Sequence, residues 1–171
     1  MKFLGSWIYI KVAIFPGKFD PINNGQLDII KKASKLFNKL IVVVVKEKYK
    51  DCLFSVENRL QFIRQSTVNF SNVETDYWPK PLHEYVAISH AVAIIRGIKS
   101  CFNLNNEINF NIFNETSNNE LTQTIFMMPN PKNIYINCEL VRNLCLLKKN
   151  LSSVVPKVVE QEIKKEVLKC L

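Results

Sequence analysis

The residues best suited to chemistry follow apolar runs that are typical of buried strands. Arg96 and Gly97 come directly after the run from Ala91 to Ile95. A guanidinium binds phosphate through two parallel hydrogen bonds, and a glycine lets the backbone approach a nucleotide closely. Lys50 lies in a charged loop that follows another apolar run. A lysine in such a loop is equally well explained as a solvated side chain. The pattern predicts phosphate binding at the carboxyl end of a strand.

A loop rich in turn residues joins the first apolar run to a helical pattern. Pro16-Gly17 ends the run that begins at Val12, and Asn23-Asn24-Gly25 forms a second turn cluster. From Leu27 the apolar residues recur at helical spacing. The N-terminus of such a helix presents unpaired N–H groups and a partial positive charge, which favour anions. The loop is therefore a candidate phosphate-binding loop, although an ordinary strand-to-helix turn would have the same pattern.

Strand-like runs alternate with helical stripes along the whole chain. The expected strands are 12–15, 40–45, 72–75, 91–95 and 124–128, with a short extended piece at 134–136. The expected helices are 25–37, one that Ser55 caps, 82–89, 103–119, 138–148 with Asn137 as its N-cap, and a last one from Pro156. This alternation predicts an α/β fold: one doubly wound, Rossmann-like parallel sheet of about five strands, with helices on both faces and a C-terminal helix. We expect residues 1–171 to form a single domain, with 1–11 as an extension leading into the first strand.

The net charge and the cysteine content indicate which kinds of binding partner to expect. The net charge of +8 favours nucleic acid, an acidic membrane surface or a phosphorylated small molecule. The lysines are spread along amphipathic segments and no apolar stretch could span a membrane, so we expect neither nucleic acid nor membrane as partner. Five cysteines without a CxxC pair, and two isolated histidines, predict no metal site and reduced thiols, as in the cytoplasm.

Four stretches of the sequence resemble one enzyme family. The first, PGKFDPINNGQLDII, is similar to the PGTFDPITNGHLDII signature of bacterial-type phosphopantetheine adenylyltransferases, members of the nucleotidyltransferase superfamily with an HxGH or TxGH motif. The others are KEKYKDCLFSVENRL, AIIRGIKS and MMPNPKNIYINCELVRNL. The resemblance implies transfer of AMP from ATP to 4′-phosphopantetheine, giving dephospho-coenzyme A and pyrophosphate in coenzyme A biosynthesis. It also implies Mg²⁺ arriving with ATP rather than held by a dedicated protein site, and a homo-oligomer, by family likeness a hexamer.

The resemblance assigns roles to individual residues. Two would be catalytic: Gln26, which replaces the motif histidine, and Lys18, which replaces a threonine. The residues implied for phosphopantetheine are Lys18, Lys50, Leu82 and Arg96. Those implied for ATP are Gly17, Lys18, Phe19, Gln26, Gly97, Ile98, Lys99, Glu107, Asn137, Cys138 and Glu139.

Several of these positions depart from the family pattern. Gln26 still donates through its amide but cannot become a cation, and Lys18 could reach into the same space and compensate. Asn137-Cys138-Glu139 stands where the family has serines. Leu82 is equally well explained as a core leucine. Two hypotheses therefore stay open: an active adenylyltransferase, or a catalytically weak or inactive homologue that binds nucleotide or pantetheine without efficient turnover.

Overall fold

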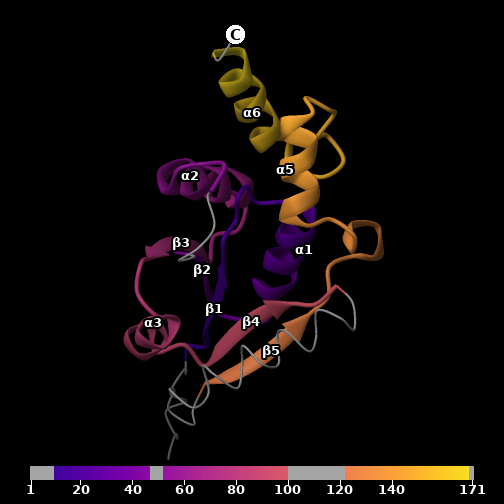
Figure 1. Ribbon diagram of the computed structural model, residues 1–171. Coiled ribbons are helices and arrows are strands. Elements are labelled where there is room, and N and C mark those ends of the chain that lie inside the picture. The colour runs from indigo at the N-terminus through magenta and orange to yellow at the C-terminus, as the bar shows by residue number, and fades with distance from the viewer. Residues whose placement is uncertain (1–9, 47–51, 100–121, 170–171) are drawn as a thin grey trace, which may run out of the picture.

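The computed structural model describes residues 10–46, 52–99 and 122–169, shown as coloured ribbon in Figure 1. The predicted helix 103–119 and the candidate residues Lys50 and Glu107 lie outside these ranges. The strands are β1 Val12–Gly17, β2 Lys39–Val45, β3 Val73–Trp78, β4 Ala93–Gly97 and β5 Gln123–Met127. The helices are α1 Asn24–Ala33, α2 Val56–Thr67, α3 Leu82–Ser89, α5 Cys138–Leu146 and α6 Lys157–Lys169, with a 3₁₀ turn η1 at Pro131–Asn133.

The strands form one parallel sheet in the order β3-β2-β1-β4-β5. Strand β2 is apolar at every position after its first residue, because it lies inside the sheet and both of its faces are covered. The predicted doubly wound α/β fold is thereby confirmed.

Alternate residues of the strands enter two separate cores. Ala13 and Phe15 of β1 pack in the larger core with apolar side chains of α1, α2, α5 and α6. Ile14 points to the opposite face, where it packs with Tyr85 and Val86 of α3. Figure 1 shows α3 on the other side of the sheet from α1 and α5. Helices therefore cover both faces of the sheet.

Strands β1 and β4 separate at their carboxyl ends. They pair only at Ala13–Ala93 and Ile14–Ile94, whereas β1 pairs with β2 as far as Gly17 and β4 pairs with β5 as far as Gly97. The strand order reverses at this boundary, with β2 and β3 on one side and β4 and β5 on the other. Such a reversal in an open α/β sheet leaves a crevice in which ligands bind.

Two local expectations were wrong. Helix α1 ends at Ala33 rather than near 37, because Leu36 is largely exposed and Phe37 only partly buried, so neither extends the apolar stripe into the core. Residues 134–136, expected as extended, instead follow η1 in a turn in which the N–H of Ile136 donates to the carbonyl of Asn133.

Candidate active site

The N-terminus of α1 is closed by a reciprocal cap. The Asn23 side chain accepts the backbone N–H of Gln26 at 3.0 Å, and the Oε1 atom of Gln26 accepts the backbone N–H of Asn23 at 3.1 Å. This capping box satisfies two of the N–H groups that a helix start leaves open. Gln26 is thereby held at the carboxyl end of β1, where the sequence predicted it to act.

The N-terminus of α5 faces the N-terminus of α1. The predicted cap is confirmed, since Asn137 accepts the backbone N–H of Leu140 at 2.6 Å. The next residue, Cys138, brings its Sγ to 3.7 Å from Nδ2 of Asn23 and 3.8 Å from Nε2 of Gln26. Two positive helix ends therefore lie together beside the crevice, which makes the place favourable for a polyanion.

Helix α1 also holds the segment that leads from β5 to α5. The Asp28 carboxylate accepts the N–H of Asn130 at 3.1 Å and the side-chain amide of Asn133 at 2.7 Å. Lys32 donates to the carbonyl of Met128 at 2.6 Å. A Cβ on Gly25 would lie 3.1 Å from the carbonyl oxygen of Asn133, so only glycine permits this approach without a shift. These contacts fix the position of the α5 N-terminus.

The end of β4 contributes to both sides of the crevice. Gly97 lies against α1, where an added Cβ would come within 2.7 Å of Ile29 Cδ1. Arg96, one position earlier, is partly buried and by strand alternation belongs to the opposite, α3 side of the sheet. Lys99, just after the strand, donates through Nζ to the carbonyl of Ile136. Partial burial lowers the pKa of Lys99 from its usual value.

The thiol of Cys138 lies among these groups and is partly buried. Burial raises its pKa, while the ammonium groups of Lys99 and Lys18 act in the opposite direction. Lys99 is held near the α5 N-terminus by its hydrogen bond to the carbonyl of Ile136. A protonated, partly buried thiol is a poor nucleophile, so Cys138 has a structural rather than a covalent role here.

The sequence did not point to one buried carboxylate, that of Asp20 in the loop between β1 and α1. Asp20 is wholly buried and accepts the backbone N–H groups of Leu53 and Phe54 at 2.8 and 2.9 Å. Its Oδ2 also pairs with the Arg142 guanidinium of α5 at 2.8 Å. Asp20 thus joins the β1–α1 loop to α5 and to the segment before α2. The FDP and LVR portions of the quoted motifs contain these two residues, although nothing in their spacing shows that they pair.

A second buried charge, Arg59 of α2, was also missed. Only 4% exposed, it donates to the Lys18 carbonyl at 2.9 Å and to the Ser55 carbonyl at 3.3 Å. It therefore fixes the backbone of the residue whose side chain was predicted to take part in catalysis.

The structure brings most of the described candidates together, with three exceptions. Gly17, Lys18, Gln26, Gly97, Ile98, Lys99, Asn137 and Cys138 belong to the strand ends and helix starts around the crevice. Phe19 is fully buried, with its ring packed edge-on against Phe15, so only its backbone is available to a ligand. Leu82 lies in the smaller core on α3, and Glu139 is exposed in the first turn of α5.

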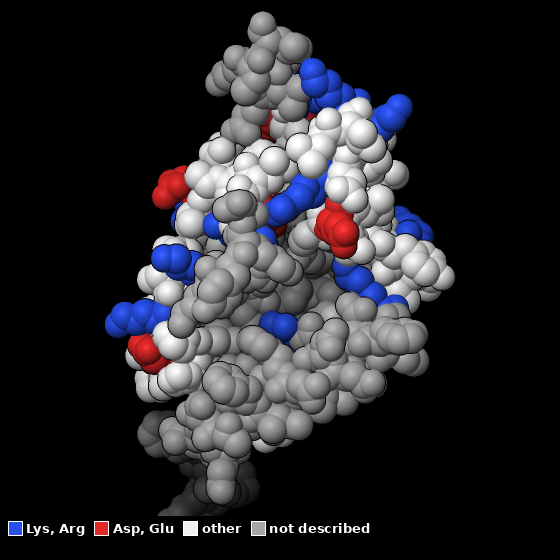
Figure 2. Space-filling model, viewed as in Figure 1, with Lys and Arg blue, Asp and Glu red and all other residues white. Residues whose placement is uncertain are grey.

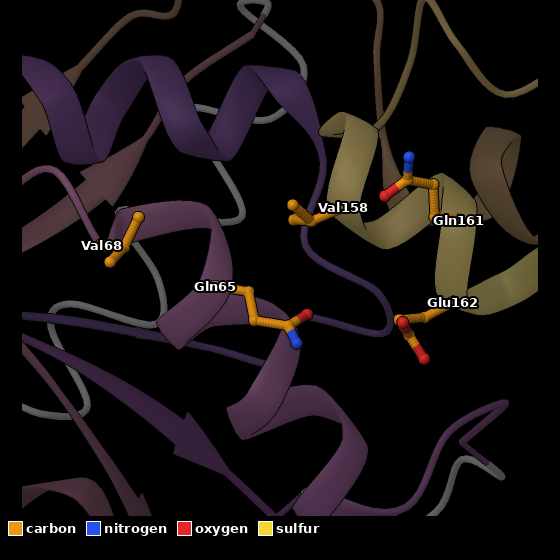
Figure 3. Close-up of a pocket in the computed structure, with 5 residues that line it drawn as sticks. All are labelled: Gln65, Val68, Val158, Gln161 and Glu162. Carbon is orange, nitrogen blue, oxygen red and sulfur yellow. The ribbon is translucent and has the colours of Figure 1, made fainter.

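Several Lys and Arg side chains lie on the face of the molecule that is seen in Figure 2. Figure 2 shows Lys and Arg side chains around a hollow near the middle of the face that carries α1 and α5 in Figure 1. A separate pocket of about 280 Å³ lies between α2 and α6 and is lined by Gln65, Val68, Val158, Gln161 and Glu162 (Figure 3). It contains none of the candidate residues, and we assign it no part in the site. Among the described helices, none is long and apolar enough to cross a membrane.

Comparison with known proteins shows the family to which the chain belongs. Residues 14–144 match the cytidylyltransferase-like family, so the chain is of the nucleotidyltransferase class. A phosphopantetheine adenylyltransferase of Caldanaerobacter subterraneus is 36% identical over 90% of this chain and 96% of its own length. That of Helicobacter pylori is 35% identical over 91% of this chain and 98% of its own. The chain therefore belongs to the phosphopantetheine adenylyltransferase family, as its motifs indicated.

A solved structure shares the fold. The putative nicotinate-nucleotide adenylyltransferase of Vibrio parahaemolyticus superposes with a TM-score of 0.67 over 92% of this chain and 94% of its own. At 17% sequence identity, this likeness concerns the fold alone.

Proposed function

We propose that this protein transfers the adenylyl group of ATP to 4′-phosphopantetheine. An oxygen of the acceptor phosphate attacks the α-phosphorus of ATP. The bond between the α-phosphorus and the oxygen that bridges it to the β-phosphate breaks, and dephospho-coenzyme A and pyrophosphate leave. The observation that carries the proposal is the meeting of two helix N-termini, those of α1 and α5, at the reversal of strand order. The ammonium group of Lys99 lies beside them. This arrangement suits a triphosphate.

The two substrates would occupy opposite sides of the strand ends. Gly97, Lys99 and the start of α5 lie on the α1 side and would receive ATP. Arg96 belongs to the α3 side and would receive the acceptor, with the guanidinium on its phosphate. Leu82 is buried in the smaller core and would contribute through packing rather than direct contact. The transferring phosphorus would then lie between the two sides, near Gln26 and Lys18. Catalysis of this kind needs positioning and charge stabilisation rather than a covalent intermediate.

Mg²⁺ would enter with the phosphates of ATP, where it lowers their charge. The nearest buried carboxylate, Asp20, is not suited to hold it, because both of its oxygens already accept hydrogen bonds. The described residues contain no cluster of three or more His, Cys, Asp or Glu side chains with metal-site geometry. We therefore assign no protein ligand to the ion.

The test is the reaction itself. Purified protein is incubated with ATP, Mg²⁺ and 4′-phosphopantetheine, pyrophosphate release is followed by a coupled assay, and dephospho-coenzyme A is identified by mass spectrometry. We expect both products in equal amounts, and a large loss of turnover in Arg96→Ala. Absence of both products, with thermal stabilisation by each substrate, would instead support the non-catalytic homologue that binds without turnover.

A further inference from the structure

The pocket between α2 and α6 contains a buried oxygen atom that lacks a hydrogen bond. Among the described side chains, Oε1 of Gln65 is the one buried nitrogen or oxygen atom without a hydrogen-bond partner. Gln65 lines the pocket, and Figure 3 shows its amide extending from α2 towards α6. A buried polar atom of this kind costs free energy until a donor reaches it. The oxygen therefore marks where the hydrogen-bond donor of a ligand would bind.

The rest of the lining is apolar and acidic. Val68 of α2 and Val158 of α6 provide apolar walls, and Glu162 of α6 adds a carboxylate. The volume of about 280 Å³ lies just below that of ordinary small-molecule sites, which start at about 300 Å³. The pocket therefore has the size for a small ligand with a short alkyl chain and a donating head group.

The local charge favours a cationic head group. None of the described residues that line the pocket is basic. Two basic side chains on the same helices are directed to other partners. Nε of Arg64 donates to Thr75 Oγ1 at 3.0 Å, and Lys164 pairs with Glu160 at 2.7 Å. The groups that face the pocket are therefore acceptors without a cation of their own in the lining.

We propose that this pocket binds a small aliphatic amine in its ammonium form. Its N–H groups would lie on Oε1 of Gln65 and on the Glu162 carboxylate, with the alkyl chain against the valines. An ammonium group only donates, so it satisfies the Gln65 oxygen and opposes no lone pair to the carboxylate. A carboxylate ligand of the same shape would place acceptors against acceptors and does not fit.

Both walls of the pocket also hold the loop between β1 and α1. Arg59 of α2 donates to the Lys18 carbonyl at 2.9 Å. The Val154 carbonyl, in the segment before α6, accepts the backbone N–H of Asn24 at 2.9 Å. A ligand that contacts α2 and α6 together therefore acts on both ends of this loop. The amine is then an effector of the active site, a consequence that rests on the function proposed above, whereas its binding does not.

The binding test compares three probes with the same carbon skeleton. Isopentylamine, isopentanol and isovalerate are each titrated at neutral pH and constant ionic strength into the ¹⁵N-labelled full-length protein. We expect isopentylamine to give saturable shifts of the backbone amides of Gln65, Val68 and Val158. Isopentanol should bind more weakly, and isovalerate should give no shifts there. Equal responses to all three probes, or tighter binding of isovalerate, would overturn the proposal.

Substitutions in the lining identify the groups that hold the amine. Gln65→Leu removes the acceptor at similar volume, so the affinity for isopentylamine should fall at least about tenfold. The melting temperature of the free variant should not fall, because leucine leaves no buried oxygen without a donor. Glu162→Gln should weaken isopentylamine but not isopentanol. The control is Glu84→Gln, which breaks an exposed 3.8 Å pair with Lys80 on the opposite face of the sheet. It should leave all affinities unchanged, and unaltered amine affinity in Gln65→Leu would contradict the site.

The effect on the loop is measured separately. Saturating isopentylamine should shift the amide signals of Lys18 and Asn24 in the wild type but not in Gln65→Leu. A loop already held at both ends loses less freedom when a nucleotide binds. The affinity for a non-hydrolysable ATP analogue with Mg²⁺ should therefore rise at least about fivefold. No shift at either amide, or an unchanged affinity, would contradict the effector role. An analogue that binds neither with nor without the amine would contradict the proposed function and not the pocket.

Discussion

At the scale of single residues, the site depends on a charge that no ligand touches. Asp20 has no exposed surface, and its carboxylate is satisfied by two backbone N–H groups and the Arg142 guanidinium. Ionised groups are kept in an interior only when they are paired and hydrogen-bonded in this way. Through these contacts one side chain fixes the loop behind Lys18 and Gln26 relative to α5.

We predict that Asp20→Asn strongly destabilises the fold. An asparagine would turn its NH2 group towards at least one of the three donors, and the Arg142 guanidinium would lose its counter-charge. Breaking a buried pair from one side costs about 3–5 kcal/mol in the free energy of unfolding, measurable by urea denaturation. The control is Glu74→Gln, which breaks the exposed 2.8 Å pair with Lys39 and should cost less than about 1 kcal/mol. Equal losses in the two variants would refute the role given to Asp20.

Residues with local partners could be predicted from the sequence, whereas those with distant partners could not. The caps at Ser55 and Asn137 were foreseen because each accepts an N–H three residues further on. Asp20 and Arg142 are 122 residues apart, and the sequence pattern of neither segment indicates that they pair. For the same reason, the approach of Cys138 to Gln26 becomes visible only once α1 and α5 are placed together.

At the scale of elements, the close approach of β4 to α1 depends on a glycine, Gly97, which has no side chain. Among the described residues, a Cβ on Gly97 would meet one atom within 4 Å, the Cδ1 of Ile29, at 2.7 Å. Ile29 is itself almost fully buried, so its end has little room to move. The glycine that the motif pattern associated with nucleotide approach therefore also serves helix packing.

We predict that Gly97→Ala and Ile29→Val are coupled. Alone, Gly97→Ala should destabilise by about 1–3 kcal/mol through overpacking, and Ile29→Val by about 0.5–1.5 kcal/mol through loss of a methyl group. Because valine lacks Cδ1, the double variant should be more stable than the sum predicts, with a coupling of at least about 0.5 kcal/mol. Urea unfolding of all four proteins measures this coupling. Strict additivity would show that the crowding at Gly97 has another source.

Element types were easier to predict from the sequence than element limits. The strand at 40–45 and the helix at 82–89 were foreseen nearly to the residue, because their apolar patterns are dense and bounded by turn residues. Helix α1 was expected to be longer, since the stripe that continues through Leu36 looks helical in the sequence. Only the fold shows that Leu36 has no core to enter, being 62% exposed.

At the scale of the whole molecule, the sheet places two sets of residues on opposite faces of one crevice. Successive residues of β4 point to opposite sides, so Arg96 belongs to the α3 face and Gly97 to the α1 face. In the function that we propose, this strand end at a reversal of order would serve two ligands at once, as transfer between them requires. The alternating sequence pattern was sufficient to predict a doubly wound parallel sheet, whereas the strand order, and with it the place of the reversal, is known only from the structure.

The titrating groups predict how the stability of the whole protein depends on pH. Burial raises the pKa of the Cys138 and Cys145 thiols above 9.0, and burial together with the Asp76 carboxylate raises that of Tyr85 well above 10.0. The unfolded chain therefore releases these protons at lower pH than the native protein does. Since the native state then binds more protons, the free energy of unfolding falls as the pH rises through about 9 and beyond. Lys99 acts in the opposite direction, because its pKa is lowered from 10.5, but among the described residues it is one group against three.

We accordingly expect the urea midpoint to be level from about pH 7 to 8 and to decrease from about pH 9 upwards. Tyr85→Phe should flatten the decrease above pH 10, although it also loses the 2.7 Å hydrogen bond to Asp76 and so begins from a lower midpoint. Lys99→Met should steepen the decrease, because the one opposing group is removed. A midpoint that rises between pH 9 and 10.5 in the wild-type protein would show that Lys99 outweighs the two thiols and the phenol, and the pH dependence argued here would be wrong.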